Sequence, residues 1–352
     1  MLRDLQLRNF RCFAAIAVEF SEGFNFIVGA NGQGKTTLLE AACVLLRLQS
    51  QRSATLAPAV RAGERSFILS GHLSAHLLQF YYSPLRRKVA FDGVEQRDPA
   101  EYLQLGRVVS FANHDLMLVR GGAEVRRRYL DFIGSQVDAR YRPALRAYEK
   151  ALRSRNALLK SSHARPRELA AYTAPLLQAG AALREMRAIL VRRLAPAAEA
   201  SHRAISDNQE ALAIEYLPGN DIDFAAHLER VAPEDARLRL TTIGSHRDDL
   251  QLRIQGMAAA PFASEGQQRT AALGLKLAQA RIFAEEAGAP PLLLIDDIFG
   301  ELDGRRRNAL LEALPNESQK LVTATSLEWR EKNWAGPVLE LAHGKIHPSS
   351  SR

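Results

Sequence analysis

A glycine-rich stretch with one lysine and two threonines carries the clearest chemistry of the chain. Residues 29–37 read GANGQGKTT and satisfy the pattern G-x-x-x-x-G-K-[S/T] without a mismatch. Glycines let the backbone curl so that successive N–H groups point at phosphate oxygens, and a following helix adds the positive end of its dipole. Lys35 would reach the β- and γ-phosphates of a nucleotide, and the Thr36 hydroxyl would ligate Mg²⁺. The nucleotide-binding residues that this stretch predicts are Gly29, Ala30, Asn31, Gly32, Gln33, Gly34, Lys35, Thr36 and Thr37.

Two consecutive carboxylates end an apolar run much later in the chain. Residues 292–295 read LLLI, and Asp296 and Asp297 follow. A run that is apolar on both faces is typical of a central parallel strand, and open α/β sheets bind ligands at the carboxyl ends of such strands. Asp296 could hold Mg²⁺ through water, and Asp297 could orient or deprotonate an attacking water. We therefore expect Thr36 and Asp296 to hold the metal ion and Lys35 and Asp297 to be catalytic.

Two further motifs flank this run. Residues 264–269 read SEGQQR and open an expected helix with Ser264 as its N-cap, and residues 301–303 read ELD. This order is typical of ABC-type ATPases, in which two subunits face each other and the serine of one caps the γ-phosphate bound by the other. The positive end of a helix facing a phosphate is the physical reason. ATP, Mg²⁺ and an ATP-dependent homodimer are therefore expected, with further nucleotide-binding residues at Ser264, Gly266, Gln267 and Asp303.

The surrounding patterns predict the elements that position these residues. Residues 24–28 read as a buried strand before the glycine loop, and a helix follows from residue 36 to about residue 48. Alternating residues predict strands around Leu5–Leu7 and Ile16–Phe20, then at 67–73, 77–82 and 88–91, with a turn at Asp92 and Gly93. Long helical periods fill residues 110–240, punctuated by Pro143 and Pro196, and three serines at 349–351 predict a frayed tail.

These patterns predict an α/β fold. The expected architecture is an ABC-type, SMC-head-like P-loop ATPase lobe of mixed sheet and helices, into which an α-helical lobe is inserted. The glycine loop and the carboxylate strand lie far apart in the sequence, so both ends of the chain must assemble one ATPase. The expected domains are residues 1–108, with the phosphate loop and an antiparallel subdomain, the helical insertion 109–240, and the C-terminal ATPase part 241–352.

Composition narrows the class of protein. The chain has 352 residues, 47% of them hydrophobic, which is normal for a globular protein with a core. Charges near the N-terminus and the lack of 18 uninterrupted apolar residues argue against a signal peptide and a membrane span, so we expect a cytoplasmic protein without a membrane partner. Cys12 and Cys43 lack partners at metal-ligand spacing and are expected to be small core residues.

The net charge of +8 suggests a polyanionic partner such as DNA, although an arginine-rich composition can also follow from genome base content. The candidate DNA contacts are Arg52, Arg126, Arg127 and Arg128. A solvated helix face is the alternative for the last three. The run at 86–88, RRK, could also touch DNA, but on an edge strand such a run more often guards against aggregation.

Nearly the full length of the chain resembles the RecF family of bacterial DNA replication and repair proteins, relatives of the SMC heads without the long coiled coil. The ATP motifs are widely shared, whereas the Arg-Arg-Tyr-Leu-Asp and His-Arg-Asp-Asp elements are specific to this resemblance. The stretches that carry it are 9–11, 29–40, 115–116, 121–122, 127–131, 148–152, 155–160, 244–250, 264–269, 295–297 and 301–303.

The resemblance implies an ATP-dependent DNA-binding protein of replication and recombinational repair. Such a protein would close as an ATP-bound dimer on duplex DNA and single-strand/duplex junctions near gaps, and would help RecA loading together with RecO and RecR. It would be a weak, DNA-stimulated ATPase that acts as a switch. The motifs leave two alternatives open: a nucleotide-binding subunit of an ABC transporter and a P-loop small-molecule kinase.

Some positions depart from the family's pattern, and none of them is an ATP motif. Residues 46–48 occupy a stretch that is usually richer in glycine. Asn113, Ala123 and Ser245 stand where the family usually has proline. His114 replaces an acidic residue, and Leu240 replaces a glycine. The resemblance therefore implies the ATP chemistry more directly than it implies the partner contacts.

Overall fold

A six-stranded sheet carries the glycine loop and the two carboxylates. The computed structural model describes residues 1–53, 55–161, 166–330 and 334–348, so the tail expected at 349–351 lies outside the described residues. The sheet has the order β15-β14-β3-β13-β12-β8, and all its neighbouring strands are parallel except β14 and β15. Its strands are β3 (Phe24–Val28), β8 (Val108–Ala112), β12 (Leu292–Asp296), β13 (Lys320–Ala324), β14 (Val338–Ala342) and β15 (Lys345–Pro348).

The apolar run before the two carboxylates is a central strand, as expected. β12 lies between β13 and β8, and its first four residues are buried because both faces of the sheet are covered. Helix α1 (Lys35–Arg47) follows the glycine loop and packs near β12 and β13. β8, β14 and β15 were not predicted.

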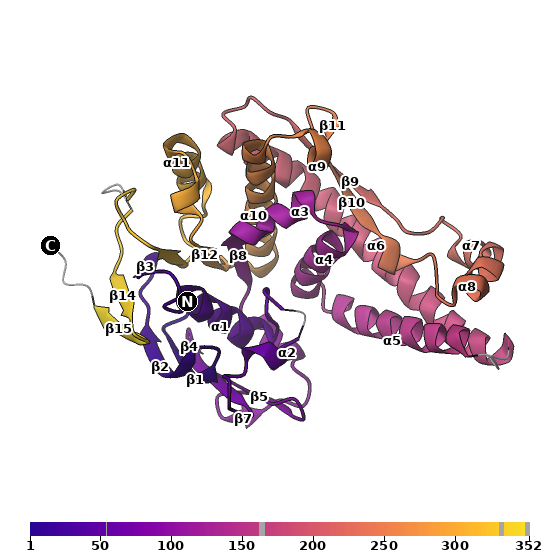
Figure 1. Ribbon diagram of the computed structural model, residues 1–352, viewed down its shortest axis with the longest axis horizontal. Coiled ribbons are helices and arrows are strands. Elements are labelled where there is room, and N and C mark those ends of the chain that lie inside the picture. The colour runs from indigo at the N-terminus through magenta and orange to yellow at the C-terminus, as the bar shows by residue number, and fades with distance from the viewer. Residues whose placement is uncertain (54, 162–165, 331–333, 349–352) are drawn as a thin grey trace. The chain divides into compact units, whose positions relative to one another are not determined.

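A second, antiparallel sheet packs on α1 in the order β2-β1-β4-β5-β6-β7 (Figure 1). Buried and exposed residues alternate along its strands, so one face belongs to the core and the other meets solvent. Asp92 and Gly93 both have positive φ and form the predicted turn between β6 and β7. The elements are β1 (Asp4–Phe10), β2 (Phe13–Glu19), β4 (Phe67–Leu73), β5 (His76–Tyr82), β6 (Arg87–Phe91), β7 (Val94–Glu95) and the short helix α2 (Ala100–Gln104).

The middle of the chain is mainly helical, as expected, but it also contains a small sheet of order β11-β10-β9. Its core is built from Tyr141, Tyr148, Leu176 and Leu183 of two long helices together with Phe224. The elements are α3 (Met117–Arg120), α4 (Ala123–Val137), α5 (Tyr141–Lys160), α6 (Pro166–Ile205), β9 (Leu212–Leu217), α7 (Phe224–Arg230), α8 (Ala232–Leu238), β10 (Asp249–Ile254), β11 (Met257–Ala258) and α9 (Ala259–Phe262). Helices α10 (Glu265–Ala287) and α11 (Gly304–Ala313) complete the chain.

The chain forms two compact units. The first contains Met1–His114 and the residues from Ala280 onward, and the second contains Asp115–Gln279. The expected boundaries, 108/109 and 240/241, differ from these. The later boundary moves because β10 pairs with β9 inside the second unit, and because α10 starts there and ends in the first.

The expectation that Pro196 interrupts the helical segment was wrong, because α6 continues through this proline. Leu194 and Ala198, on either side of this proline, are fully buried, so packing stabilises the helix at that point. Among the described residues, no helix is long and apolar enough to cross a membrane.

Candidate nucleotide-binding site

The glycine loop connects β3 to α1 and adopts backbone conformations that favour glycine. Gly32 and Gly34 have φ of 81° and 103°, and Gly34 is the residue at the N-terminus of α1. At Gly29 a Cβ atom would lie 2.3 Å from the carbonyl oxygen of Leu341 on β14, so the space excludes a side chain. The loop therefore has the close backbone approach and the free helix N-terminus that phosphate binding requires.

Lys35 is 6% exposed and its ammonium group lies over the glycine loop. Lys35 Nζ donates to the carbonyl oxygens of Gly29 at 2.6 Å and Ala30 at 3.1 Å. The loop tip is fixed from the other side, because the backbone N–H of His343 donates to Gln33 Oε1 at 2.8 Å. The cation is thus held among the peptide groups expected to surround phosphate.

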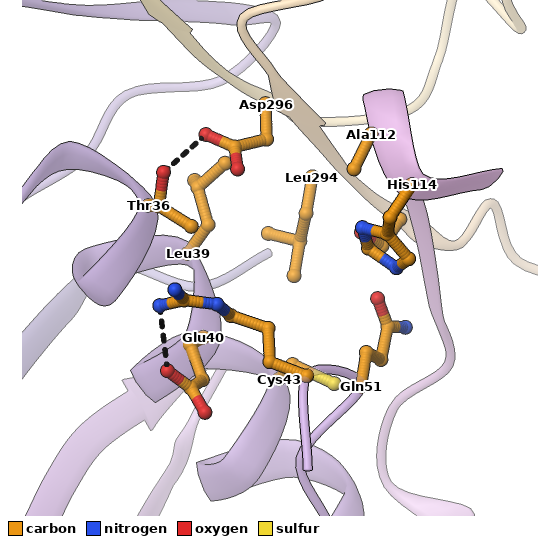
Figure 2. Close-up of a pocket in the computed structure, with 11 residues that line it drawn as sticks. Thr36, Leu39, Glu40, Cys43, Gln51, Ala112, His114, Leu294 and Asp296 are labelled. Carbon is orange, nitrogen blue, oxygen red and sulfur yellow. Dashed lines mark hydrogen bonds and ion pairs between the residues drawn. The ribbon is translucent and has the colours of Figure 1, made fainter. Parts of the chain in front are cut away.

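The two residues expected to hold the metal ion lie in direct contact. Thr36 Oγ1 donates to Asp296 Oδ1 at 2.8 Å, as Figure 2 shows. Thr323 Oγ1 on β13 donates to the same oxygen at 2.8 Å. Thr36 lies in the first turn of α1 and Asp296 ends β12, so two distant parts of the sequence meet at one edge of the sheet. A hydroxyl and a carboxylate oxygen are hard ligands of the kind that Mg²⁺ uses beside nucleotide phosphates, so the donor set fits this ion.

Asp297 is held at the same edge in a left-handed conformation, with φ of 52°. Its backbone N–H donates to Thr323 Oγ1 at 3.1 Å and to the Thr323 carbonyl at 3.2 Å. Burial raises the pKa of the Asp297 carboxyl, Lys35 opposes the rise, and Asp296 and Glu301 add to it. Asp and Asn tolerate this conformation better than other residues with a side chain, which is consistent with aspartate here.

Asp303 begins α11 and acts as its N-cap. Its side chain accepts from the backbone N–H of Arg306 at 2.9 Å, and Arg306 Nη1 lies 3.3 Å from its other carboxylate oxygen. A side-chain cap stabilises the start of a helix by about 1 kcal/mol. The position thus has a local structural role, and its expected contact with nucleotide stays a prediction.

A small cavity of about 50 Å³ lies beside the Thr36–Asp296 contact in the first unit (Figure 2). Gln51, His114 and Glu40 also line it. Glu40, whose side chain is 1% exposed, bonds to both Arg11 and Arg52. Arg11 Nη2 lies 2.7 Å from Glu40 Oε1, and Arg52 Nη1 lies 3.3 Å from Oε2.

The pairing of the buried Glu40 with two arginines was not predicted from the sequence. Its one visible signal was a carboxylate on the otherwise apolar face of the helix after the glycine loop. The contact also gives Arg52, a candidate DNA contact, an internal partner.

In the second unit, Ser264 caps α10 as predicted. Its Oγ accepts from the backbone N–H of Gln267 at 3.3 Å, and Gln267 Oε1 accepts from the backbone N–H of Ser264 at 2.9 Å. This is a reciprocal capping box. The Gln268 amide, 4% exposed, donates to the carbonyls of Ala259, Ala260 and Ala263 and so fixes the turn before the helix. Gly266, in the first turn of α10, adds no side chain there.

The arginines proposed as DNA contacts differ in their surroundings. Arg126 bonds to Asp249 through two nitrogens, at 2.6 and 2.9 Å, and its side chain is 12% exposed. Arg127 donates to the Asp248 carbonyl at 2.8 Å, and burial lowers the pKa of its guanidinium. Arg128 is 63% exposed and pairs with Glu124 one helical turn away. Internal contacts thus argue against Arg126 and Arg127 as DNA contacts.

The departures from the family pattern are accommodated locally. Asn113 Nδ2 donates to Glu301 Oε1 at 3.1 Å, and His114 lines the cavity beside Thr36 and Asp296. Ser245 Oγ donates to the Gly180 carbonyl at 3.1 Å. Ala123 begins α4, and Leu240 follows the end of α8, where its N–H bonds to the Asp235 carbonyl.

The sheet order and the glycine loop identify the chain as having the fold of SMC-head-like P-loop ATPases. The family described as "RecF/RecN/SMC N terminal domain" matches residues 1–333. A "DNA replication and repair protein RecF" from Synechococcus sp. (strain JA-2-3B'a(2-13)) is 36% identical over 373 residues, which cover 99% of this chain and 98% of the relative. The protein of the same name from Bacillus cereus (strain G9842) is 34% identical over 93% of this chain and 92% of its own length. The chain therefore belongs to the RecF family of DNA replication and repair proteins.

Solved structures agree with this membership. The "recombination mediator protein RecF-ATP in RecFOR pathway" matches with a TM-score of 0.90 and 29% identity, covering 99% of this chain and 97% of the other. An SMC head bound to the C-terminal winged-helix domain of ScpA matches with a TM-score of 0.55 and 15% identity over 98% of this chain and 97% of the other, which supports the fold alone. These findings favour the RecF family over the transporter subunit and the kinase that the motifs left open.

Proposed function

We propose that the chain binds Mg·ATP at the glycine loop and uses it to control binding to DNA in replication and recombinational repair. The observation that carries the proposal is the meeting of Lys35, Thr36, Asp296 and Asp297 at one edge of a parallel sheet. The RecF relatives and the ATP-bound RecF structure support it.

Each residue has a role that its position allows. The loop N–H groups and Lys35 would bind the β- and γ-phosphates, and Thr36 and Asp296 would hold Mg²⁺, which neutralises phosphate charge when bound. Thr323 keeps the Asp296 carboxylate oriented through its hydroxyl. Asp297 would accept a proton from, or orient, the attacking water. Its side chain is one methylene shorter than the glutamate found in many ABC-type ATPases, so we expect slow hydrolysis suited to a switch.

The signature around Ser264 would complete the site of a second copy. Its serine and the N-terminus of α10 present a hydroxyl and backbone N–H groups of the kind that bind phosphate. ATP would then sit between two copies and favour a homodimer, because a ligand that binds only the associated state shifts the equilibrium towards it. The dimer would close on duplex DNA and on single-strand/duplex junctions. In the cytoplasm it would act with RecO and RecR in RecA loading.

The test is fluorescence anisotropy of labelled single-stranded, duplex and gapped DNA with ATP, with ADP and with no nucleotide. Binding that tightens only with ATP, and most on substrates containing duplex, is the expected result. The Lys35→Ala variant should lose this ATP dependence because the charge opposite the phosphates is removed. Equal affinity under all three nucleotide conditions would refute control by ATP.

A further inference from the structure

The solvent face of the antiparallel sheet carries a row of four residues across four strands. Arg8 on β1 pairs with Ile68 on β4, Ile68 pairs with Tyr81 on β5, and Tyr81 pairs with Lys88 on β6. Neighbouring strands lie about 4.8 Å apart, so the row spans about 14 Å from Arg8 to Lys88. We call these four residues the outer row. A cation at each end thus encloses an aliphatic and an aromatic side chain.

The outer row faces away from the core. Each of the four residues has a strand neighbour that is buried on the opposite face, on which α1 packs. These buried neighbours are Leu7, Leu69, Phe80 and Val89. Arg8 is exposed, Ile68 is 41% exposed, the Lys88 side chain is 39% exposed and Tyr81 is half-buried. Beyond Arg8 the register continues to Ala15 of β2, whose short side chain leaves that end of the row open.

Charge is distributed unevenly over this face. The turn that joins β5 to β6 adds Arg86 at this end of the sheet, and in the same turn Leu85 is 99% exposed. Arg87, the first residue of β6, pairs with the buried Tyr82, so by strand alternation it belongs to the opposite face from Lys88. Asp4 lies four residues along β1 from Arg8, and His72 lies four residues along β4 from Ile68. His72 Nδ1 is 2.6 Å from Asp4 Oδ2, so this end of the face carries a carboxylate. Positive charge is therefore concentrated at the outer-row end of the face.

Two neighbouring cations of β6, Lys88 of the outer row and Arg87 on the other face, already make contacts. Lys88 pairs with Glu95 at 3.0 Å, with both side chains well exposed, and such surface pairs contribute only about 0–1 kcal/mol. The Arg87 guanidinium lies 5.3 Å from the centre of the Tyr82 ring. Phosphate could therefore displace Glu95 at little cost.

We propose that the outer row is a contact site for single-stranded DNA, in which a base stacks on Tyr81 beside Ile68 and flanking phosphates contact Arg8 and Lys88. Aromatic side chains between cations are the arrangement with which sheets bind single strands, because every base has a stacking face that an intact duplex does not offer. Charge complementarity favours a nucleic acid over a neutral protein surface. The inference rests on the proposed DNA-binding function and names the surface and the strand form that this function uses.

The experiment measures anisotropy of a labelled oligo(dT) strand and of a labelled duplex of equal length, with the full chain and Mg·ATP. Tyr81→Leu keeps apolar bulk and should weaken oligo(dT) binding at least about fivefold while leaving duplex binding within twofold, since stacking of one base contributes about 1–3 kcal/mol. Tyr81→Phe should bind like the unsubstituted chain. The double variant R8Q/K88Q should lower the salt slope for oligo(dT) by about 1.4, since each phosphate contact contributes about 0.7.

The matched control is His72→Gln, which lies on the same face at its acidic end and should leave oligo(dT) affinity unchanged. ATP binding and thermal unfolding of every variant establish that the first unit is intact. Normal oligo(dT) binding by both Tyr81→Leu and R8Q/K88Q would overturn the outer-row proposal. Failure of the unsubstituted chain to bind any DNA would instead overturn the proposed function, so the two failures are distinguishable.

Discussion

Arg126 and Asp249 form a two-pronged ion pair, with Nε–Oδ1 at 2.6 Å and Nη2–Oδ2 at 2.9 Å. The pair joins the residue of α4 that directly precedes the Arg-Arg-Tyr-Leu-Asp element to the first residue of β10, which ends the His-Arg-Asp-Asp element. The neighbouring Asp248 is fully buried and accepts from Arg187 and Tyr216, both at 2.6 Å. These elements therefore form the internal framework of the second unit.

The Arg126→Ala substitution should destabilise the second unit by about 1.5–3 kcal/mol, because it removes charge-assisted hydrogen bonds from a largely buried carboxylate partner. Chemical denaturation measures the loss. The exposed Arg128→Ala is the matched control and should stay within about 0.5 kcal/mol. A variant Arg126→Ala that keeps full stability but loses DNA affinity would restore this arginine as a DNA contact.

The Asp297→Asn substitution should abolish ATP hydrolysis and leave ATP binding unchanged. Asparagine adopts the left-handed backbone of this position as readily as aspartate, but its amide cannot accept the proton of water. The unsubstituted chain should itself turn over on the order of once per minute or less, against about 10 per second for a typical enzyme. Phosphate release and nucleotide titration measure both quantities, and hydrolysis that persists in the variant contradicts the assigned role.

The Ser264→Arg substitution should block ATP-dependent dimerisation while each monomer still binds ATP. In the proposed dimer Ser264 of one copy faces the phosphate bound by the other, so a long cation at position 264 would obstruct that phosphate. Sedimentation velocity with and without Mg·ATP measures the association. The control Ser264→Ala removes the cap, at a cost of about 1 kcal/mol, without adding bulk. Normal dimers of Ser264→Arg would refute the role across subunits.

Stability should rise with pH through the titration of His246. Its Nε2 lies 2.9 Å from the Thr241 carbonyl and must donate to it, and in the neutral ring Nδ1 accepts from the Tyr148 hydroxyl at 2.8 Å. Burial lowers the pKa of His246 below its ordinary value. As the pH falls below about 6.5, the unfolded chain takes up a proton that the folded chain resists, so this contribution to the free energy of unfolding decreases.

The measurement compares the free energy of unfolding at pH 5 and pH 7.5 in the unsubstituted chain and in His246→Gln. The variant should be less stable than the unsubstituted chain at pH 7.5, by about 1 kcal/mol for each lost hydrogen bond. It should lose less stability between the two pH values, because glutamine does not titrate. An unchanged pH dependence in the variant would assign the effect to other groups.

Sequence alone determined the elements that local chemistry specifies. The glycine loop, the strand at 292–296 and the Ser264 cap all follow from residue type and spacing over short distances, and each forms as predicted. Strands β14 and β15 were not predicted, because their short segments carry little periodicity and form only through pairing, β14 with β3 and β15 with β14.

Tertiary structure decided which side chains meet. The contact of Thr36 with Asp296 was anticipated from the order of motifs, but the burial of Glu40 between Arg11 and Arg52 was not. Nor could composition separate the buried Arg126 from the exposed Arg128, since neighbouring residues on a helix point in different directions and only packing determines which face is covered. The outer row likewise exists only through strand register, which brings Arg8 and Lys88 onto one face from distant parts of the chain.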